Sequence, residues 1–326
     1  MGRSDFFNFI IIIIHKHIIK VYKTSFIYKG ISIMKKQTLL LCAATLIPSI
    51  VTASTNHTES THAEATHGHA VADSLIAEQR AELAENTKDK GFGPQSPRDI
   101  DSIKGENKRS FGSAPAYTSM NLCNIHFHKN AEHKGGEFAT YAGNGDGHGY
   151  NSGYVYSGKL SASELTKLKE AVGSSEHGSL YPGDTIEVHY VHSTAQVKPG
   201  ATLGACLNDS IGNPQLRVET QVFVLVNDDS ALDFSDLTAN GVKDGYQQAL
   251  NIPTNTGDAV QYIGSTTGPG YNEKASPFQV SWSVRPKVAK VNIHSVGKWL
   301  EGNIYDEDHA HGVRNLVINP TLLSNK

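Results

Sequence analysis

The stretch Cys123-Asn124-Ile125-His126-Phe127-His128-Lys129-Asn130-Ala131-Glu132-His133 decides how the rest of the chain is interpreted. Its centre alternates apolar and polar residues, which is the pattern of a half-buried β-strand. Side chains two residues apart on a strand share a face, so His126 and His128 are expected to point the same way. Two imidazoles on one face suggest a metal site, but a tetrahedral zinc ion needs a further protein ligand.

A second strand pattern supplies the candidate third ligand. Residues 184–193 read Asp-Thr-Ile-Glu-Val-His-Tyr-Val-His-Ser, which places Glu187 and His189 on one face. If the two strands are neighbours, His126, His128 and His189 converge and leave a fourth position for water, as in catalytic zinc sites. Histidines on strands are also common as surface or hydrogen-bonded residues, so the spacing alone leaves a structural role open.

The composition is that of an ordinary soluble protein. The chain has 326 residues, of which 19% are charged and 38% hydrophobic, with a net charge of -3. This length allows one large domain or two small ones. There is no basic excess, so nucleic acid is not an expected partner.

The first 53 residues are predicted to be an N-terminal extension and a signal peptide. Met34-Lys35-Lys36 precedes an apolar run from Leu39 to Val51, and Val51-Thr52-Ala53 offers a small-residue cleavage site. We therefore expect Met34 to be the true start, cleavage near Ala53, a mature form without a membrane span, and a periplasmic or secreted location. An uncleaved N-terminal anchor is the alternative.

The mature chain keeps two cysteines, Cys123 and Cys206. An even pair in an exported protein suggests one disulfide, with two buried free thiols as the alternative.

Residues 54–90 are expected to form a disordered linker and a short helix. The stretch 54–72 is rich in Ser, Thr, Ala, Glu and His and cannot bury a core. Helical spacing of Ala, Glu and Leu follows over Asp73–Thr87. A histidine-rich tract can bind metal weakly, although a solvated linker explains it equally well.

Residues 91–326 are expected to form the catalytic domain, which is mainly β with a few helices (α+β). Strands are expected over Val218–Val226 and Phe278–Val284. A capping box at Ser161–Glu164 predicts a helix reaching Val172, and a further helix is expected within Asp236–Leu250.

Several stretches, in order over about residues 91–286, resemble motifs of the alpha-class carbonic anhydrases. They are Gln95–Ile100, Asn124–His128, Glu132-His133, Glu187–His192, Tyr262–Pro269 and Val280–Val284. Each match is weak alone, but their shared order is hard to obtain by chance. The resemblance implies a large, twisted, mostly antiparallel sheet.

The compact spacing from His126 to His133 and the stretch around Cys206 look more like the delta class, known from marine algae and from exported bacterial proteins. The resemblance implies zinc-dependent reversible hydration of carbon dioxide to bicarbonate and a proton, through zinc-bound hydroxide. The chain departs from the alpha pattern in its shorter loop before Glu132, in Gly268, and in having no clear match to the proton-shuttling histidine.

The same resemblance implies roles around the metal. His126, His128 and His189 would bind Zn²⁺, and Asn124 and Glu187 would accept N–H groups of ligand imidazoles.

A hydrogen-bond relay would orient the hydroxide. Glu132 would accept from a threonine hydroxyl, for which Thr267 is the first choice and Thr266 the alternative. Val191, on the ligand face, would line an apolar pocket for carbon dioxide and could equally be a core residue. The proton carrier stays open among four histidines: His148, His177, His192 and His309.

Two other functions compete with this prediction. The histidine-rich segment is compatible with an exported zinc-binding or buffering protein without catalysis. A zinc hydrolase usually needs a carboxylate base beside the metal, and the chain has no His-Glu-x-x-His motif. The sequence gives no indication of the oligomeric state.

Overall fold

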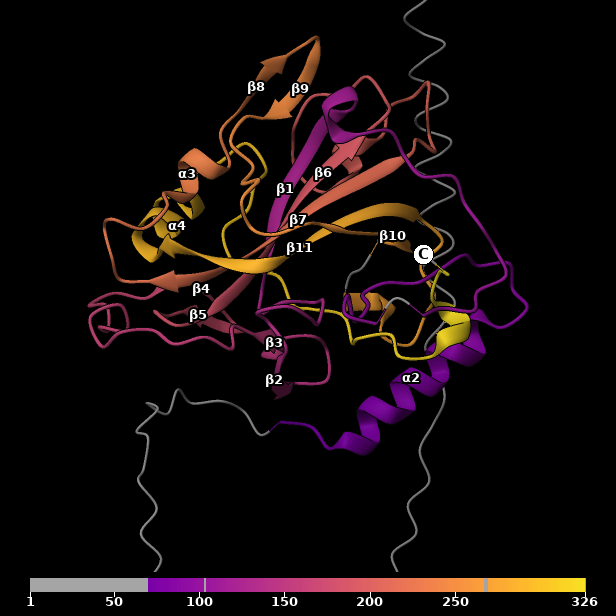
Figure 1. Cartoon of the computed structure of the whole chain (residues 1–326), viewed down its shortest axis with the longest axis horizontal. Helices are drawn as coiled ribbons and strands as arrows, with labels where there is room; N and C mark the ends of the chain where they lie inside the picture. Colours follow the sequence, from indigo (N-terminus) through magenta and orange to yellow (C-terminus); the bar gives the residue numbers. More distant parts are fainter. Residues whose placement is uncertain (1–69, 103, 267–268, 326) are drawn as a thin grey trace, which may run out of the picture. The chain divides into compact units, whose positions relative to one another are not determined.

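A five-stranded sheet forms the centre of the molecule (Figure 1). The computed structural model describes residues 70–102, 104–266 and 269–325. The sheet order is β1 (Asn121–Lys129), β6 (Thr185–Ser193), β7 (Leu216–Val226), β11 (Gln279–Asn292) and β10 (Val260–Ser265). Only β7 and β11 pair in parallel; the other three neighbouring pairs in this sheet are antiparallel. The predicted mainly β fold with a mostly antiparallel sheet is confirmed.

Smaller elements surround this sheet. The hairpins are β2 (Thr140–Asn144) with β3 (Ser152–Val155), β4 (Val172–Ser175) with β5 (Gly178–Leu180), and β8 (Asn240–Lys243) with β9 (Tyr246–Ala249). The described α-helices are α2 (Asp73–Thr87), α3 (Phe234–Leu237) and α4 (Ile293–Leu300), and short 3-10 turns lie at η1 (Tyr117–Ser119), η2 (Leu203–Cys206), η3 (Pro269–Tyr271) and η4 (Pro320–Leu322). None of the described helices is both long and apolar enough to cross a membrane.

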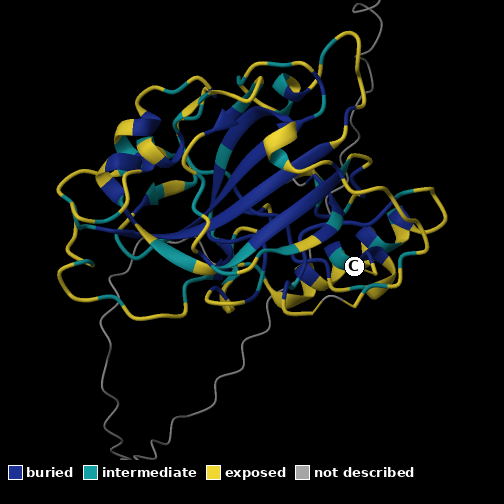
Figure 2. Cartoon of the chain, turned by 45° about the horizontal axis from the view of Figure 1, so that its top comes forward, coloured by how far each residue is buried: buried dark blue, intermediate teal, exposed yellow. Residues whose placement is uncertain are grey.

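Strand alternation gives the sheet two different faces. On one face, Ile125 and Phe127 of β1 join Val188 of β6 in a buried apolar cluster that includes Phe234 of α3 and Trp299 of α4. Each of these residues is buried, and Figure 2 colours the central strands mostly as buried. This cluster packs against one face of the sheet and leaves His126, His128 and His189 on the opposite face.

Two expected helices are not found. The capping-box bonds between Ser161 and Glu164 do form, but the segment stays a turn. Tertiary hydrogen bonds occupy backbone carbonyls that a helix would use. The amide of Asn227 donates to the carbonyl of Glu164, and the Asn227 side chain donates to the carbonyl of Thr166. Val172 lies in β4 instead of a helix.

The expected helix within Asp236–Leu250 is replaced by the hairpin β8–β9. Asp244 and Gly245 at its tip both have positive φ, of 52° and 86°, which suits a tight hairpin turn and not a helix.

Several sequence predictions lie outside the described residues. They concern the extension and signal peptide over 1–53 and the histidine-rich stretch up to residue 69. By contacts the chain divides into Met1–His62 and Ala63–Lys326, and only the second unit contains described residues. The predicted helix Asp73–Thr87 is confirmed as α2.

The predicted disulfide is present. Cys123 on β1 and Cys206 in η2 are bonded, with their Cα atoms 4.9 Å apart. Both residues are fully buried. The bond therefore fixes the loop after β6 against the strand that carries His126 and His128.

His192 on β6 is buried on the face opposite His189. Its Nδ1–H donates to the carbonyl of Tyr190 at 3.0 Å, and its Nε2 has no hydrogen-bond partner among the described residues. Burial above all, assisted by the charge of Arg217, lowers the pKa of His192 to about 3. The folded protein thus holds this imidazole neutral well below the pH at which an unfolded chain protonates it.

The His192→Gln variant should be less sensitive to acid than the unmodified protein. Because the folded-state pKa is depressed, the stability linked to His192 is present above pH ~6.5 and is lost as pH falls toward about 3. Between pH 7 and 5, the unmodified protein should lose about 2 kcal/mol more unfolding free energy than the variant. Urea unfolding at both pH values measures this, and equal losses would contradict it.

Candidate metal centre

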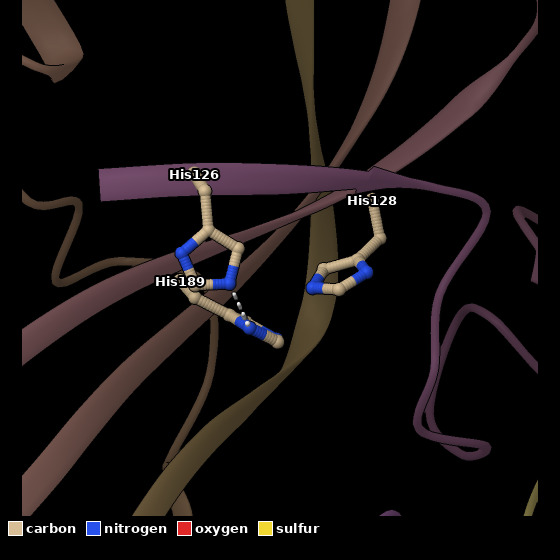
Figure 3. A group of neighbouring side chains, drawn as sticks. All are labelled: His126, His128 and His189. Carbon is tan, nitrogen blue, oxygen red and sulfur yellow. Dashed lines mark hydrogen bonds between the residues drawn. The ribbon is translucent and has the colours of Figure 1, made fainter. Parts of the chain in front are cut away.

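The register of β1 and β6 brings three histidines together. His126 lies directly opposite His189 in the antiparallel pair, and His128 lies opposite Glu187. One ring nitrogen from each of His126, His128 and His189 lies within 4.8 Å of the others. Figure 3 shows the two β1 imidazoles and that of His189 converging on one point. The three predicted ligands are therefore neighbours.

Each of these rings has one nitrogen bonded to an oxygen acceptor. Nδ1–H of His126 donates to Oδ1 of Asn124 at 2.6 Å, and Nδ1–H of His128 donates to the carbonyl of Gly312 at 2.7 Å. Nε2–H of His189 donates to Oε1 of Glu187 at 2.7 Å. A neutral imidazole carries one N–H, so these acceptors fix the tautomer of each ring.

The remaining nitrogens are lone-pair donors that face one another. They are Nε2 of His126, Nε2 of His128 and Nδ1 of His189. Burial, followed by the neighbouring histidines, lowers the pKa of His126 well below its ordinary value, and burial above all lowers the pKa of His128 to about 4. The rings of His126 and His128 therefore stay neutral, and ring nitrogens whose lone pairs face one another are unfavourable without a cation between them.

The geometry fits a tetrahedral metal ion. Nδ1 of His189 and Nε2 of His126 are 3.3 Å apart, the contact drawn in Figure 3. Two nitrogens bound to one tetrahedral ion at about 2.0–2.1 Å lie about 3.3–3.4 Å from each other. Nε2 of His128 is buried and has no hydrogen-bond partner among the described residues. The donor set and its spacing could thus hold a metal.

A second group of possible ligands, His133, Glu187 and His189, lies beside the first. There the nitrogens and oxygens already satisfy each other, because Glu187 accepts from both histidines at 2.7 Å. This group therefore supports the metal ligands and is a poorer site itself.

His133 contacts the candidate centre, although the sequence analysis gave it no role. Its ring is fully buried, with Nδ1–H donating to Glu187 and Nε2 lying 2.6 Å from the hydroxyl of Tyr262. Burial by itself raises the pKa of Glu187, but its interactions with His133 and then with His189, which include a hydrogen bond from each ring, outweigh burial and lower that pKa. Glu187 is thereby held ionised, facing Nε2–H of His189. The only sequence signal was the Glu132-His133 pair itself.

Asn124 is held with its side-chain oxygen toward His126. Its amide nitrogen donates to the carbonyl of Gly200 at 3.1 Å, so its oxygen faces His126. The amide of Gly200 in turn donates to the carbonyl of Cys123. The loop that the disulfide fixes to β1 thus orients Asn124.

Glu132 is buried next to the site, as a relay residue should be. Its Oε1 accepts the backbone amide of Arg314 at 3.0 Å and lies 3.9 Å from Nδ1 of His128. The C-terminal segment 312–315 therefore contacts the centre twice, because the carbonyl of Gly312 in the same segment accepts from His128.

The structure separates the two candidate threonines. The hydroxyl of Thr266 is 2.8 Å from that of Ser276, so it is engaged with another hydroxyl. Thr267, the first choice, lies outside the described residues.

Apolar side chains lie on the ligand face of the sheet. Val191 is buried and pairs with Val218 across β6 and β7, and both belong to one cluster with Trp282. The ring centroid of Trp282 is 5.0 Å from that of His189. One flank of the site is therefore apolar.

His311 is the second residue to which the sequence analysis gave no role. Its ring lies 5.5 Å from that of His126, and its Nε2 is 2.6 Å from a carboxylate oxygen of Glu307. Its side chain is 38% exposed, so it connects the centre to solvent. Burial by itself lowers the pKa of His311, but Glu307 outweighs this and raises it.

The structure gives the surroundings of three of the four histidines that the sequence left open as proton carrier. His192 lies buried on the opposite face of the sheet, and His177 stacks on Tyr150 with centroids 3.4 Å apart. His309 lies next to His311, at 6.0 Å between ring centroids.

Comparison with known proteins gives the family. A family model described as delta carbonic anhydrase matches residues 117–295, more than half of the chain. No curated protein matches the sequence.

Similar solved structures are alpha-carbonic anhydrases and a further carbonic anhydrase. That of Thermovibrio ammonificans with the inhibitor sulfanilamide is 17% identical, over 68% of this chain and 84% of that chain, with a TM-score of 0.24. That of Photobacterium profundum is 19% identical over 74% and 93%, and a hyperthermostable carbonic anhydrase from a hydrothermal vent chimney is 14% identical over 70% and 86%, both with a TM-score of 0.24.

The family match includes β1 and β6, which carry all three converging histidines. The chain belongs to the delta carbonic anhydrase family and is a carbonic anhydrase.

Proposed function

We propose that the protein catalyses the reversible hydration of carbon dioxide to bicarbonate and a proton with Zn²⁺ held by His126, His128 and His189. The observation that carries the proposal is the convergence of three unprotonated ring nitrogens, each on an imidazole whose N–H is bonded to an oxygen. Carbon dioxide and bicarbonate are then the small-molecule partners.

A bound Zn²⁺ supplies hydroxide at neutral pH by lowering the pKa of its water to about 7, as is established for carbonic anhydrases. Three neutral imidazoles leave the full charge of the ion available for this effect. Asn124, Glu187 and the carbonyl of Gly312 keep the three rings in their required tautomers and orientations.

Glu132 and Thr267 form the proposed relay. In this relay the carboxylate of Glu132 would accept a hydrogen bond from the hydroxyl of Thr267, whose oxygen would in turn accept a hydrogen bond from the hydroxide and orient it toward carbon. Two facts support this assignment: Glu132 is buried and held by the amide of Arg314, and the hydroxyl of Thr266 is engaged with Ser276.

Substrate binding and proton release use different sides of the centre. Val191 and Trp282 offer carbon dioxide an apolar surface and exclude water there. His311 takes the released proton at its ring, with Glu307 balancing the charge, and passes it to buffer in solvent.

The His128→Ala variant should lose most of its zinc, since two histidines cannot fill a tetrahedral site. Metal analysis of the purified protein should give about one zinc per chain before the substitution and well below one after it. His192→Gln, which removes a buried histidine from the other face of the same sheet, is the control and should keep its zinc. Stoichiometric zinc in His128→Ala would rule out this ligand set.

The Thr267→Ala variant should retain zinc and lose about 10²–10³-fold in hydration rate, the usual effect of deleting one preorganised hydrogen bond to a reacting group. Glu132→Gln should behave similarly, and the double variant should be little worse, because both residues act in one hydrogen-bond chain. Stopped-flow hydration assays with metal analysis measure both effects.

Thr266→Ala serves as the control for the relay and should keep most of the activity. Full activity in Thr267→Ala and Glu132→Gln would overturn the relay. Stoichiometric zinc without any hydration in the unmodified protein would favour a zinc store.

The His311→Ala variant should show a lower kcat with kcat/KM nearly unchanged, because proton release follows the chemical step. The loss should be about 10²-fold, at the lower end of acid–base catalysis, and imidazole buffer should restore part of it. His309→Ala is the neighbouring control and should stay near full rate. Unchanged kcat at low buffer concentration would assign proton release to another group.

A further inference from the structure

We infer that helix α2 positions the metal centre through Gln79, a role that rests on the proposed function. The helix spans Asp73–Thr87 and precedes the matched region 117–295. The C-terminal segment 312–315 follows that region. Helix α2 and the segment 312–315 meet beside the metal centre. Their contact controls two hydrogen bonds of the centre, those of His128 and Glu132 with the segment.

The C-terminal segment acts on the site through its backbone. The carbonyl of Gly312 accepts from Nδ1 of His128, and the amide of Arg314 donates to Glu132. One bond fixes the tautomer of a ligand, and the other fixes the carboxylate of the relay. Since both groups are backbone atoms two residues apart, their positions depend on what holds the segment.

A glycine-rich loop holds the segment from one side. The amide of Val313 donates to the carbonyl of Gly149 at 2.8 Å, and a Cβ on Gly149 would lie 2.5 Å from the Val313 carbonyl oxygen. A side chain at this position would therefore push the two apart. The same loop packs against α2, because a Cβ on Gly147 would lie 3.0 Å from Leu75.

Gln79 links the helix to both of these parts. It is 4% exposed, and its amide nitrogen donates to the carbonyl of Gly147 at 2.7 Å. Its oxygen accepts from the side-chain amide of Asn315 at 2.6 Å. One buried amide thus holds the loop and the segment at the same time, with both of its ends satisfied.

The remaining contacts of Asn315 carry this constraint toward the site. Its backbone amide donates to the side chain of Asn272 at 2.8 Å, while the preceding residue, Arg314, bonds through its guanidinium to the carbonyls of Ser96 and Lys274. The segment is therefore held on several sides. Gln79 links it to α2 through a buried side-chain pair, and Nε of Arg80, also on α2, donates to the carbonyl of Leu316 just beyond the segment.

Other bonds dock the helix without reaching the segment. The side chain of Asn144 donates to the carbonyl of Val71 and to Asp73 at the start of the helix, both at 2.8 Å. Asn144 therefore offers a matched control, which weakens docking of the helix and leaves the pair of Gln79 and Asn315 in place.

The test compares Gln79→Leu, Asn315→Ala, their double variant and Asn144→Ala in the full chain. Zinc affinity is measured by chelator competition, hydration by stopped flow, and folding by thermal unfolding. Loss of a direct outer partner of a ligand typically costs about 10–100-fold in metal affinity or activity. Gln79 acts one step further away, so Gln79→Leu should weaken zinc binding by about 3–10-fold and lower kcat with KM unchanged.

Asn315→Ala should give the same losses, and the double variant should not exceed either one, because both residues act through one contact. Asn144→Ala should lower thermal stability and keep the zinc affinity and kcat of the unmodified protein. Zinc affinity in Gln79→Leu equal to that of Asn144→Ala, or additive losses in the double variant, would overturn the role of Gln79. Absence of zinc binding or hydration in the unmodified protein would contradict the proposed function itself.

Discussion

The candidate metal centre depends on which nitrogen of each of its three imidazoles carries the proton. Each has one N–H and one lone pair, and in His126, His128 and His189 the N–H is given to an oxygen outside the triad. The lone pairs are thereby directed at one another in a buried place, where protonation is disfavoured. A divalent cation would remove this conflict, so the hydrogen bonds of the three histidines suit the proposed metal site as much as the histidines themselves do.

Each acceptor comes from a different part of the fold. Asn124 is oriented by the disulfide-bonded loop, and Glu187 is held ionised by His133, which also contacts Tyr262 of β10. The carbonyl of Gly312 comes from the C-terminal segment, which runs beside β1. The apolar cluster on the other face of the sheet fixes β1 and β6 in one register, and that register sets the spacing of the ligands.

Period-two alternation predicted that His126 and His128 share a face, and the pairing of β1 with β6 brings His189 beside them. The cysteine pair predicted the disulfide near them. The carbonyl of Gly312 was beyond prediction, because a backbone acceptor has no sequence signature and its segment is far away in the chain. His311 was missed because it lies in the same distant part of the chain. The helix expected after Ser161 does not form because tertiary hydrogen bonds from Asn227 override local capping.

The most direct measurement of the central claim is a zinc-edge anomalous difference map from crystals of the purified protein. The account predicts one peak at about 2.0–2.1 Å from Nε2 of His126, Nε2 of His128 and Nδ1 of His189. A peak held instead by His133, Glu187 and His189, or zinc bound with any of the three predicted nitrogens outside bonding distance, would contradict it.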